Sequence, residues 1–157
     1  MKSLLDYNPE TGVFTWKVGR GRGAKKGQIA GYIHSSGYRY IRVGGRGYYA
    51  HRLAWFFYYN EWPKGHLDHK DRDRANNAIS NLRECTRSEN GQNSTKSWGS
   101  SKYQGVTWDN STGKWKAHIG VNNKRVYLGC FDNELEAANA YTEAKAKHHT
   151  FYWKEGV

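Results

Sequence analysis

The sequence predicts an α+β protein made of two parts, each a small antiparallel sheet with one main helix. Short stretches of alternating apolar and polar residues are separated by Gly-, Asn- and Ser-rich turns, which is typical of antiparallel strands. Residues 51–59 and 134–148 instead read as helices. A Gly/Ser/Asn/Thr-rich segment separates the two parts, so we expect domains at residues 1–93 and 102–157, joined by a linker at 94–101.

The composition predicts a polyanionic partner. The chain has 25 Lys and Arg against 14 Asp and Glu, a net charge of +11, and residues 1–93 hold 16 of those cations but only 8 of the acids. No apolar run approaches the length of a membrane span, and no secretion signal follows Met1, so we expect a cytoplasmic protein. Cys85 and Cys130 form no CxxC pair, which predicts no structural zinc and two reduced thiols packed in the core.

The first 28 residues are predicted to form a turn-rich segment. Residues 2–7 read as a short helix or turn, residues 8–12 (NPETG) as a tight turn, and residues 13–16 as an alternating strand. Residues 18–28 are rich in Gly and cations and have almost nothing to bury. They are therefore expected to form a surface loop that tracks DNA phosphates.

A meander of two or three strands is predicted over residues 31–43 and 46–50, with the helix at residues 51–59 packed on it. His51 opens this helix and is a possible second catalytic histidine. We interpret it as a structural or phosphate-contacting residue, because the motif described next already supplies a base. The turn at residues 62–65 (WPKG) then leads into the first strand of that motif.

The centre of the chain, residues 68–90, carries a metal-nuclease pattern. An Asp-His pair at residues 68–69 is followed by Asn81, twelve residues after the histidine, and by Asn90 nine residues further on. Residues 81–85 read as a short strand and the polar segment after them as a helix that carries Asn90. This spacing, with NNAISNLREC inside it, resembles the HNH endonucleases of the ββα-metal fold, in particular the homing branch found in phages and group I introns. The opening LxYNPETGxFxWK is also common in that group.

The resemblance implies a site that hydrolyses DNA phosphodiesters. It gives His69 as general base, Asp68 and Asn90 as ligands of one divalent cation, and Asn81 as the residue that orients the histidine ring. Carboxylate and amide oxygens suit such a cation, and an imidazole titrates near neutrality. Alternation along a strand turns His69 away from Asp68. Asn93 is the rival ligand, although the spacing of Asn90 matches the family better.

Basic residues around the motif are expected to bind phosphates. Those predicted as DNA contacts are Arg72, Arg74, Arg83 and Arg87. The dipeptide Arg72-Asp73 stands where the family commonly has Gly-Asn, so the turn at this point departs from the family pattern.

The pattern changes after the linker. Residues 103–108, 114–119 and 125–129 read as three strands, and residues 134–148 as an amphipathic helix. The motifs YxGVxW, GKWxAxI and LGxFDxxxEAAxAY lie in this region. They resemble the plant Apetala-2/ethylene-response DNA-binding domain over residues 102–152.

Alternation predicts which face of this sheet meets DNA. The side chains expected to face the helix are Trp115, Ala117, Ile119, Val126 and Leu128. Those expected to face outward are Lys116, His118, Gly120, Arg125 and Tyr127. In the family the outer face lies in the major groove, so the predicted DNA contacts are Gln104, Thr107, Trp108, Lys116, His118, Arg125 and Tyr127. Only Arg125 keeps one of the family's arginine positions, so a different target sequence is expected.

These features predict a metal-dependent DNA endonuclease of phage homing type, with Mg²⁺, Mn²⁺ or another divalent cation as cofactor. One such site cuts one strand, so we expect a monomer or weak homodimer that nicks double-stranded DNA in the cytoplasm of an infected bacterial host. Two alternatives remain open. One is a catalytically silent DNA-binding protein acting through residues 102–152, and the other is an HNH nuclease used in restriction or phage DNA processing.

Overall fold

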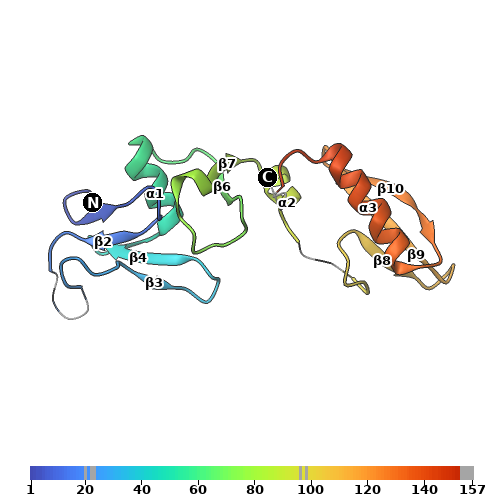
Figure 1. Cartoon of the computed structure of the whole chain (residues 1–157), viewed down its shortest axis with the longest axis horizontal. Helices are drawn as coiled ribbons and strands as arrows, with labels where there is room; N and C mark the ends of the chain where they lie inside the picture. Colours follow the sequence, from blue (N-terminus) through green and yellow to red (C-terminus); the bar gives the residue numbers. More distant parts are fainter. Residues whose placement is uncertain (20, 22–23, 96, 98, 153–157) are drawn as a thin grey trace. The chain divides into compact units, whose positions relative to one another are not determined.

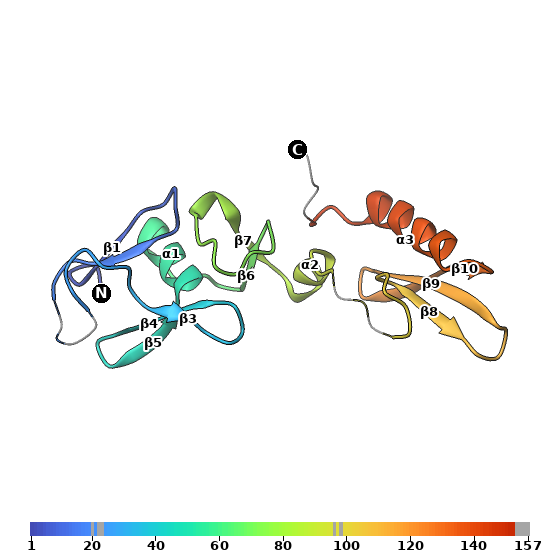
Figure 2. The ribbon, with the colours of Figure 1, turned by 60° about the horizontal axis from the view of Figure 1, so that its bottom comes forward.

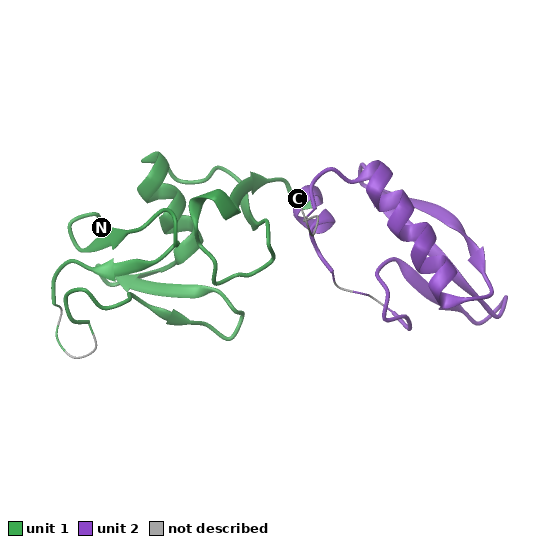
Figure 3. Cartoon of the chain, viewed as in Figure 1, with its two compact units in different colours: residues 1–87 green, residues 88–157 purple. Residues whose placement is uncertain are grey.

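The computed structural model has a mixed α+β architecture, as predicted. It describes residues 1–19, 21, 24–95, 97 and 99–152. The chain divides into two compact units, residues 1–87 and 88–157 (Figure 3). The expected boundaries at residues 93 and 102 stay a prediction.

Parts of two predicted segments lie outside the described residues. These are residues 20, 22 and 23 of the basic loop and residues 96 and 98 of the linker. Within the described ranges, no helix combines the length and the apolar character that crossing a membrane requires.

The first unit is built on two short antiparallel sheets and a helix. One sheet consists of β1 (Leu5–Tyr7) and β2 (Phe14–Trp16). The other consists, in spatial order, of β3 (Tyr32–Ile33), β4 (Arg39–Val43) and β5 (Arg46–Tyr49) (Figure 2). Helix α1 (Ala50–Tyr59) continues directly from β5 and packs against β4 and β5 (Figure 2).

The core of the first unit joins these elements. Leu5, Phe14, Ile41 and Leu53 are fully buried, so the hairpin, the sheet and the helix cover one another's apolar faces. The helix or turn expected over residues 2–7 is wrong at its end. Residues 2–4 form a turn, but the chain is extended from Leu5 onward because that side chain enters the core beside its strand partner on β2.

The first unit also contains the hairpin of the candidate site. It consists of β6 (His66–His69) and β7 (Leu82–Cys85), and a 3-10 turn η1 (Ile79–Asn81) precedes the second strand. Asn81 was predicted to lie on the strand. It instead closes the turn, because its backbone N–H donates to the carbonyl of Ala78 at 3.0 Å.

In the second unit a three-stranded antiparallel sheet packs against one helix. The strands are β8 (Val106–Asp109), β9 (Lys114–Val121) and β10 (Lys124–Phe131), with β9 in the middle. Helix α3 (Glu134–His148) covers one face, and its bounds are those predicted (Figure 1). Asn133 caps it by accepting a hydrogen bond from the N–H of Leu135 at 2.7 Å. A short helix, α2 (Arg87–Gln92), spans the division between the units.

A β-bulge in β10 corrects one prediction. The register shifts between Tyr127 and Gly129, so Cys130 pairs with Lys116 and its side chain is exposed. Strict alternation would have turned this thiol into the core. Cys85 is buried, as expected.

Candidate functional site

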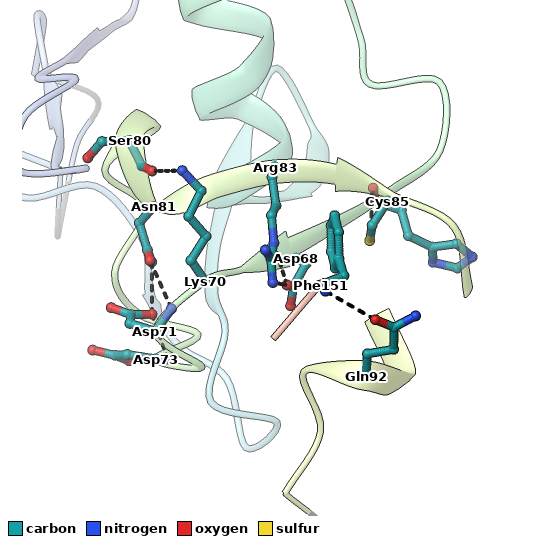
Figure 4. A network of polar contacts seen from close by, with 11 residues as sticks. Asp68, Lys70, Asp71, Asp73, Ser80, Asn81, Arg83, Cys85, Gln92 and Phe151 are labelled. Carbon is teal, nitrogen blue, oxygen red and sulfur yellow. Dashed lines mark hydrogen bonds and ion pairs between the residues drawn. The ribbon is translucent and has the colours of Figure 1, made fainter. Parts of the chain in front are cut away.

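The β6–β7 hairpin places Asp68 opposite Arg83. The carboxylate is buried, with 7% of the residue exposed, and its Oδ2 accepts hydrogen bonds from Arg83 Nε at 3.0 Å and Nη2 at 2.8 Å (Figure 4). The pair is short and charge-assisted, which is the strong form of such a contact. The predicted phosphate contact Arg83 therefore holds the predicted metal ligand.

His69 is buried beside a group of aromatic rings. Its ring lies 5.3 Å from that of His51 and 5.8 Å from that of Tyr38, centre to centre. Burial lowers the pKa of His69 below its usual value, and the hydrogen bond to Asn77 and the nearby Asp71 only partly oppose this. The imidazole is therefore neutral at physiological pH, the state that a general base requires.

Asn77, which sequence reasoning missed, faces the His69 ring. Its Oδ1 lies 3.3 Å from His69 Nε2, and its Nδ2 donates to the carbonyl of Ala75 at 2.8 Å. Because the amide oxygen is an acceptor, the proton belongs on Nε2, and Nδ1 then carries the basic lone pair. The only signal for Asn77 in the sequence is its place in the NNA tripeptide.

Asn81 was predicted to orient His69, and the structure gives it a different set of contacts. Its Nδ2 donates to Asp71 Oδ1 and to the carbonyl of Asn76, both at 2.9 Å, and its Oδ1 accepts from the backbone N–H of Asp71 at 3.1 Å (Figure 4). Position explains this, because Asn81 ends the 3-10 turn and not the strand, so its amide points into the loop. It supports the loop that carries Asn77.

That loop is fixed from both sides. Asp71 Oδ1 also accepts the N–H of Asp73 at 2.8 Å, and Arg72 between them has a φ of +68°. From the N-terminal segment, Tyr7 Oη donates to the carbonyl of Asn77 at 2.9 Å. A Cβ on Gly12 would overlap the backbone of residues 77–78. The NPETG turn thus presses directly on the loop that positions the histidine.

His51 lies next to His69, but its ring is too buried to accept a proton from solvent water. Burial, followed by the charges of His69 and Arg52, lowers the pKa of His51 to about 3. Its Nδ1 is buried, and no hydrogen-bond partner is present for it among the described residues. His51 is therefore a neutral neighbour of the candidate base.

The predicted ligand Asn90 lies on α2, in the second unit, and is exposed, whereas its rival Asn93 is buried. Its role as partner of Asp68 stays a prediction. Within the described ranges, no group of three or more His, Cys, Asp or Glu side chains could hold a metal ion. A carboxylate with one amide oxygen still fits Mg²⁺ or Mn²⁺, since such ions keep several waters and bind substrate phosphates.

The other three arginines predicted to contact DNA near the motif are Arg72, Arg74 and Arg87, and they differ in their contacts. Arg74 stacks over the ring of Tyr38 at 4.9 Å and donates to the carbonyl of Ser36 at 2.7 Å. Arg72 and Arg87 are exposed. The Arg74 guanidinium is therefore held over the Tyr38 ring, which itself lies beside the ring of His69.

The second unit carries a candidate DNA-facing surface on the side of the sheet opposite α3. Arg125 Nη2 lies 3.2 Å from His118 Nδ1, and the His118 ring contacts that of Tyr127 at 5.3 Å. Burial and the charges of Arg125 and Lys116 lower the pKa of His118, so its ring is a neutral acceptor for the guanidinium. An open pocket of about 270 Å³ lies here, and its lining residues are Gly105, Thr107, His118, Ile119, Gly120 and Arg125.

Lys116 on the same face pairs with Asp109 at 2.7 Å. This hydrogen-bonded contact holds the pKa of Asp109 well below its usual range and raises that of Lys116. Two other predicted DNA contacts, Gln104 and Trp108, have partners within the unit, and their roles as DNA contacts stay predictions. Gln104 Oε1 accepts from Lys145 on α3 at 3.2 Å, and Trp108 packs edge-on against Trp115, which lies beside the helix-covered core.

Two family models match separate parts of the chain. The HNH endonuclease model matches residues 48–92, and the AP2 domain model matches residues 101–148. The chain thus contains one segment that matches the HNH endonuclease model, called the HNH segment below, and one that matches the AP2 domain model, called the AP2 domain. The HNH segment includes Asp68, His69 and Asn90, and the AP2 domain includes β8 to α3.

Relatives and solved structures are similar over parts of this chain. The AP2-like ethylene-responsive transcription factor TOE2 of Arabidopsis thaliana is 50% identical over 48 residues, which are 31% of this chain and 10% of that protein. APETALA2-like protein 2 of Oryza sativa subsp. indica is also 50% identical over 48 residues, 11% of its length. The HNH homing endonuclease I-HmuI, in a structure of DNA binding and cleavage, is 26% identical with a TM-score of 0.41, over 57% of this chain and 50% of that one. The chain thus spans about a tenth of the plant proteins and half of the solved chain.

Proposed function

We propose that this protein is a metal-dependent DNA endonuclease of phage homing type that nicks double-stranded DNA. The observation that carries the proposal is the buried Asp68-His69 pair on the β6–β7 hairpin of the HNH segment, with the histidine kept neutral. The AP2 domain on the same chain supports DNA as the partner. A nuclease domain over residues 1–93 and a targeting domain over residues 102–157 form part of the proposal.

In this mechanism His69 is the general base. Asn77 holds the proton on Nε2, so Nδ1 takes the proton of the water that attacks the phosphorus. Asp68 and Asn90 would hold Mg²⁺ or Mn²⁺, which supplies electrophilic assistance at the scissile phosphate and stabilises the departing 3′ oxygen. Asn81 acts one step removed, by bracing the loop that carries Asn77.

Target recognition is assigned to the outer face of the AP2 sheet. Thr107, Lys116, His118, Arg125 and Tyr127 supply donors, acceptors and an aromatic ring on one surface, which is the chemistry that base edges and phosphates require. Arg125 is fixed by His118, and a fixed guanidinium suits bidentate readout of guanine better than a mobile one.

One site per chain predicts a single-strand cut by a monomer or weak homodimer. The test is cleavage of supercoiled plasmid with Mg²⁺ or Mn²⁺, comparing wild type with His69→Ala. Nicked circles from the wild type alone, abolished by EDTA, are expected. A linear first product would indicate paired sites, and band shifts without any metal-dependent product would favour a catalytically silent DNA-binding protein.

A further inference from the structure

The proposed metal ligand Asp68 already has a cation beside it. Arg83 directs both Nε and Nη2 at the single oxygen Oδ2, from the directly opposite position on β7. Only 8% of the Asp68 side chain and 21% of that of Arg83 are exposed, so solvent screens this pair poorly. The contact lies at the site of chemistry, and the proposed mechanism does not use it.

A guanidinium and a divalent cation compete for this oxygen. Mg²⁺ binds carboxylate oxygens at about 2.0–2.1 Å, so an ion on Oδ2 would face the two N–H groups of Arg83 across one atom. Two cations repel strongly in a site of low dielectric constant. Metal entry at Oδ2 therefore requires Arg83 to move away.

DNA offers Arg83 a replacement partner. The planar fork of a guanidinium matches a phosphate as well as it matches a carboxylate. The side chain is partly exposed on the hairpin that carries His69, where the scissile phosphate must approach. A phosphate that draws Arg83 off Asp68 would free the carboxylate at the moment the substrate arrives.

We infer that Arg83 is the resident counter-cation of Asp68 and exchanges this carboxylate for a DNA phosphate, so that metal and DNA bind cooperatively. The inference rests on the proposed function and makes Arg83 a positioning residue. Because coupling between two ligands is reciprocal, the free protein binds metal weakly and the metal-free protein binds DNA weakly. An arginine that only braced Asp68 for the metal would have the opposite effect on metal affinity.

The first experiment titrates Mn²⁺ into the full chain without DNA, with free Mn²⁺ followed by electron paramagnetic resonance. We expect Arg83→Met to bind Mn²⁺ about tenfold or more tightly than wild type, and Arg83→Lys to lie between them. The matched control is Arg42→Met, which removes an exposed arginine of β4 in the same unit and should leave Mn²⁺ affinity unchanged. Thermal melts establish that each variant is folded.

Equal or weaker Mn²⁺ binding by both Arg83 variants overturns the inference. The double variant Asp68→Asn/Arg83→Met separates this failure from that of the proposed site. If it binds Mn²⁺ more weakly than Arg83→Met does, the ion lies at Asp68, so a missing gain in Arg83→Met then overturns the exchange alone. If it binds Mn²⁺ as tightly as Arg83→Met does, the ion lies elsewhere, and both the inference and the proposed site are overturned.

The second experiment needs no metal. Binding of a labelled mixed-sequence duplex, measured by fluorescence anisotropy in EDTA, should tighten in Asp68→Asn because Arg83 is released to phosphate. In the Arg83→Met background the same substitution only removes a negative charge. The resulting gain in DNA affinity should therefore be smaller by about threefold or more. Equal gains in the two backgrounds contradict the exchange.

Discussion

At the scale of single residues, the candidate site keeps its histidines neutral by burial. His69 and His51 lie 5.3 Å apart between ring centres, and desolvation is the largest cause of the lowered pKa in both. Two imidazolium ions at this distance would repel in a poorly solvated place. Burial therefore keeps the candidate base neutral, but it also makes the folded state of the first unit sensitive to acid.

His51 should make the first unit unstable in acid. In the unfolded chain it takes up a proton below about pH 6.5, whereas in the fold it stays neutral down to about pH 3. The unfolded state then binds more protons, so stability falls as pH falls through this window, by on the order of 5 kcal/mol at about 1.4 kcal/mol per pH unit. Urea unfolding at several pH values should show a shallower decline for His51→Gln, and parallel curves would contradict the assignment.

Arg72 holds a left-handed backbone conformation that glycine adopts more easily. Its φ is +68°, and the family commonly has glycine at this point of the turn. We expect Arg72→Gly to raise the free energy of unfolding by about 0.5–1 kcal/mol, measured by urea denaturation. If Arg72 also contacts phosphate, the same variant should lower the salt dependence of DNA binding by about one ion.

At the scale of elements, the site depends on a turn far away in sequence. The NPETG turn packs on the backbone of residues 77–78, and the carbonyl of Pro9 accepts the N–H of Ile79 at 2.9 Å. Tyr7 adds its hydroxyl to the same loop. The opening motif therefore acts as a brace for Asn77, and through it for His69.

Gly12→Ala tests this brace against a matched glycine. Gly12 and Gly44 both have positive φ, +71° and +61°, but a Cβ on Gly44 meets open space. Gly44→Ala should cost about 1 kcal/mol from backbone strain alone. Gly12→Ala should cost about 2 kcal/mol more because of overlap, and it should reduce plasmid nicking. Equal losses of stability in the two variants would show that the turn does not press on the loop.

At the scale of the whole molecule, the two units divide the proposed work. Asp68 and His69 lie in the first unit, and the Arg125–His118 pair in the second. Changes on the AP2 sheet should therefore alter where DNA is cut, while the ability to hydrolyse it is retained.

Filling the pocket on the AP2 sheet tests this division. A Cβ on Gly120 meets nothing within 4 Å, so Gly120→Leu enters the pocket without disturbing the core. In selection from a randomised duplex library, we expect it to lose about tenfold in preference at the positions that the pocket reads. Metal-dependent plasmid nicking should persist. Cys130→Leu, on the same strand face but outside the pocket lining, is the control, and equal effects of both would exclude the pocket as the reader.

The sequence predicted most of the architecture because local signals were strong. The strands of the second unit follow from alternation and from turn residues, and the bounds of α3 follow from the helical spacing of its apolar residues. The exposure of Cys130 was not predicted because a bulge adds one residue to a strand, and a periodic pattern in the sequence does not reveal such an insertion. The extended conformation of Leu5 was not predicted because it is set by the partner strand and not by the neighbouring residues in the sequence.

By itself the sequence indicated which residues are candidates for the chemistry, since the spacing along the chain singles out Asp68 and His69 and the motifs resemble the two families whose models match. Only the tertiary structure decided what those residues touch. In the structure the hydrogen-bond partner of His69 is Asn77 and that of Asp68 is Arg83. Asn81 forms its hydrogen bonds with the loop. The physical reason is that a side chain's partner is set by the packing of segments distant in sequence, such as the NPETG turn on residues 77–78, and spacing along one chain carries no record of that packing.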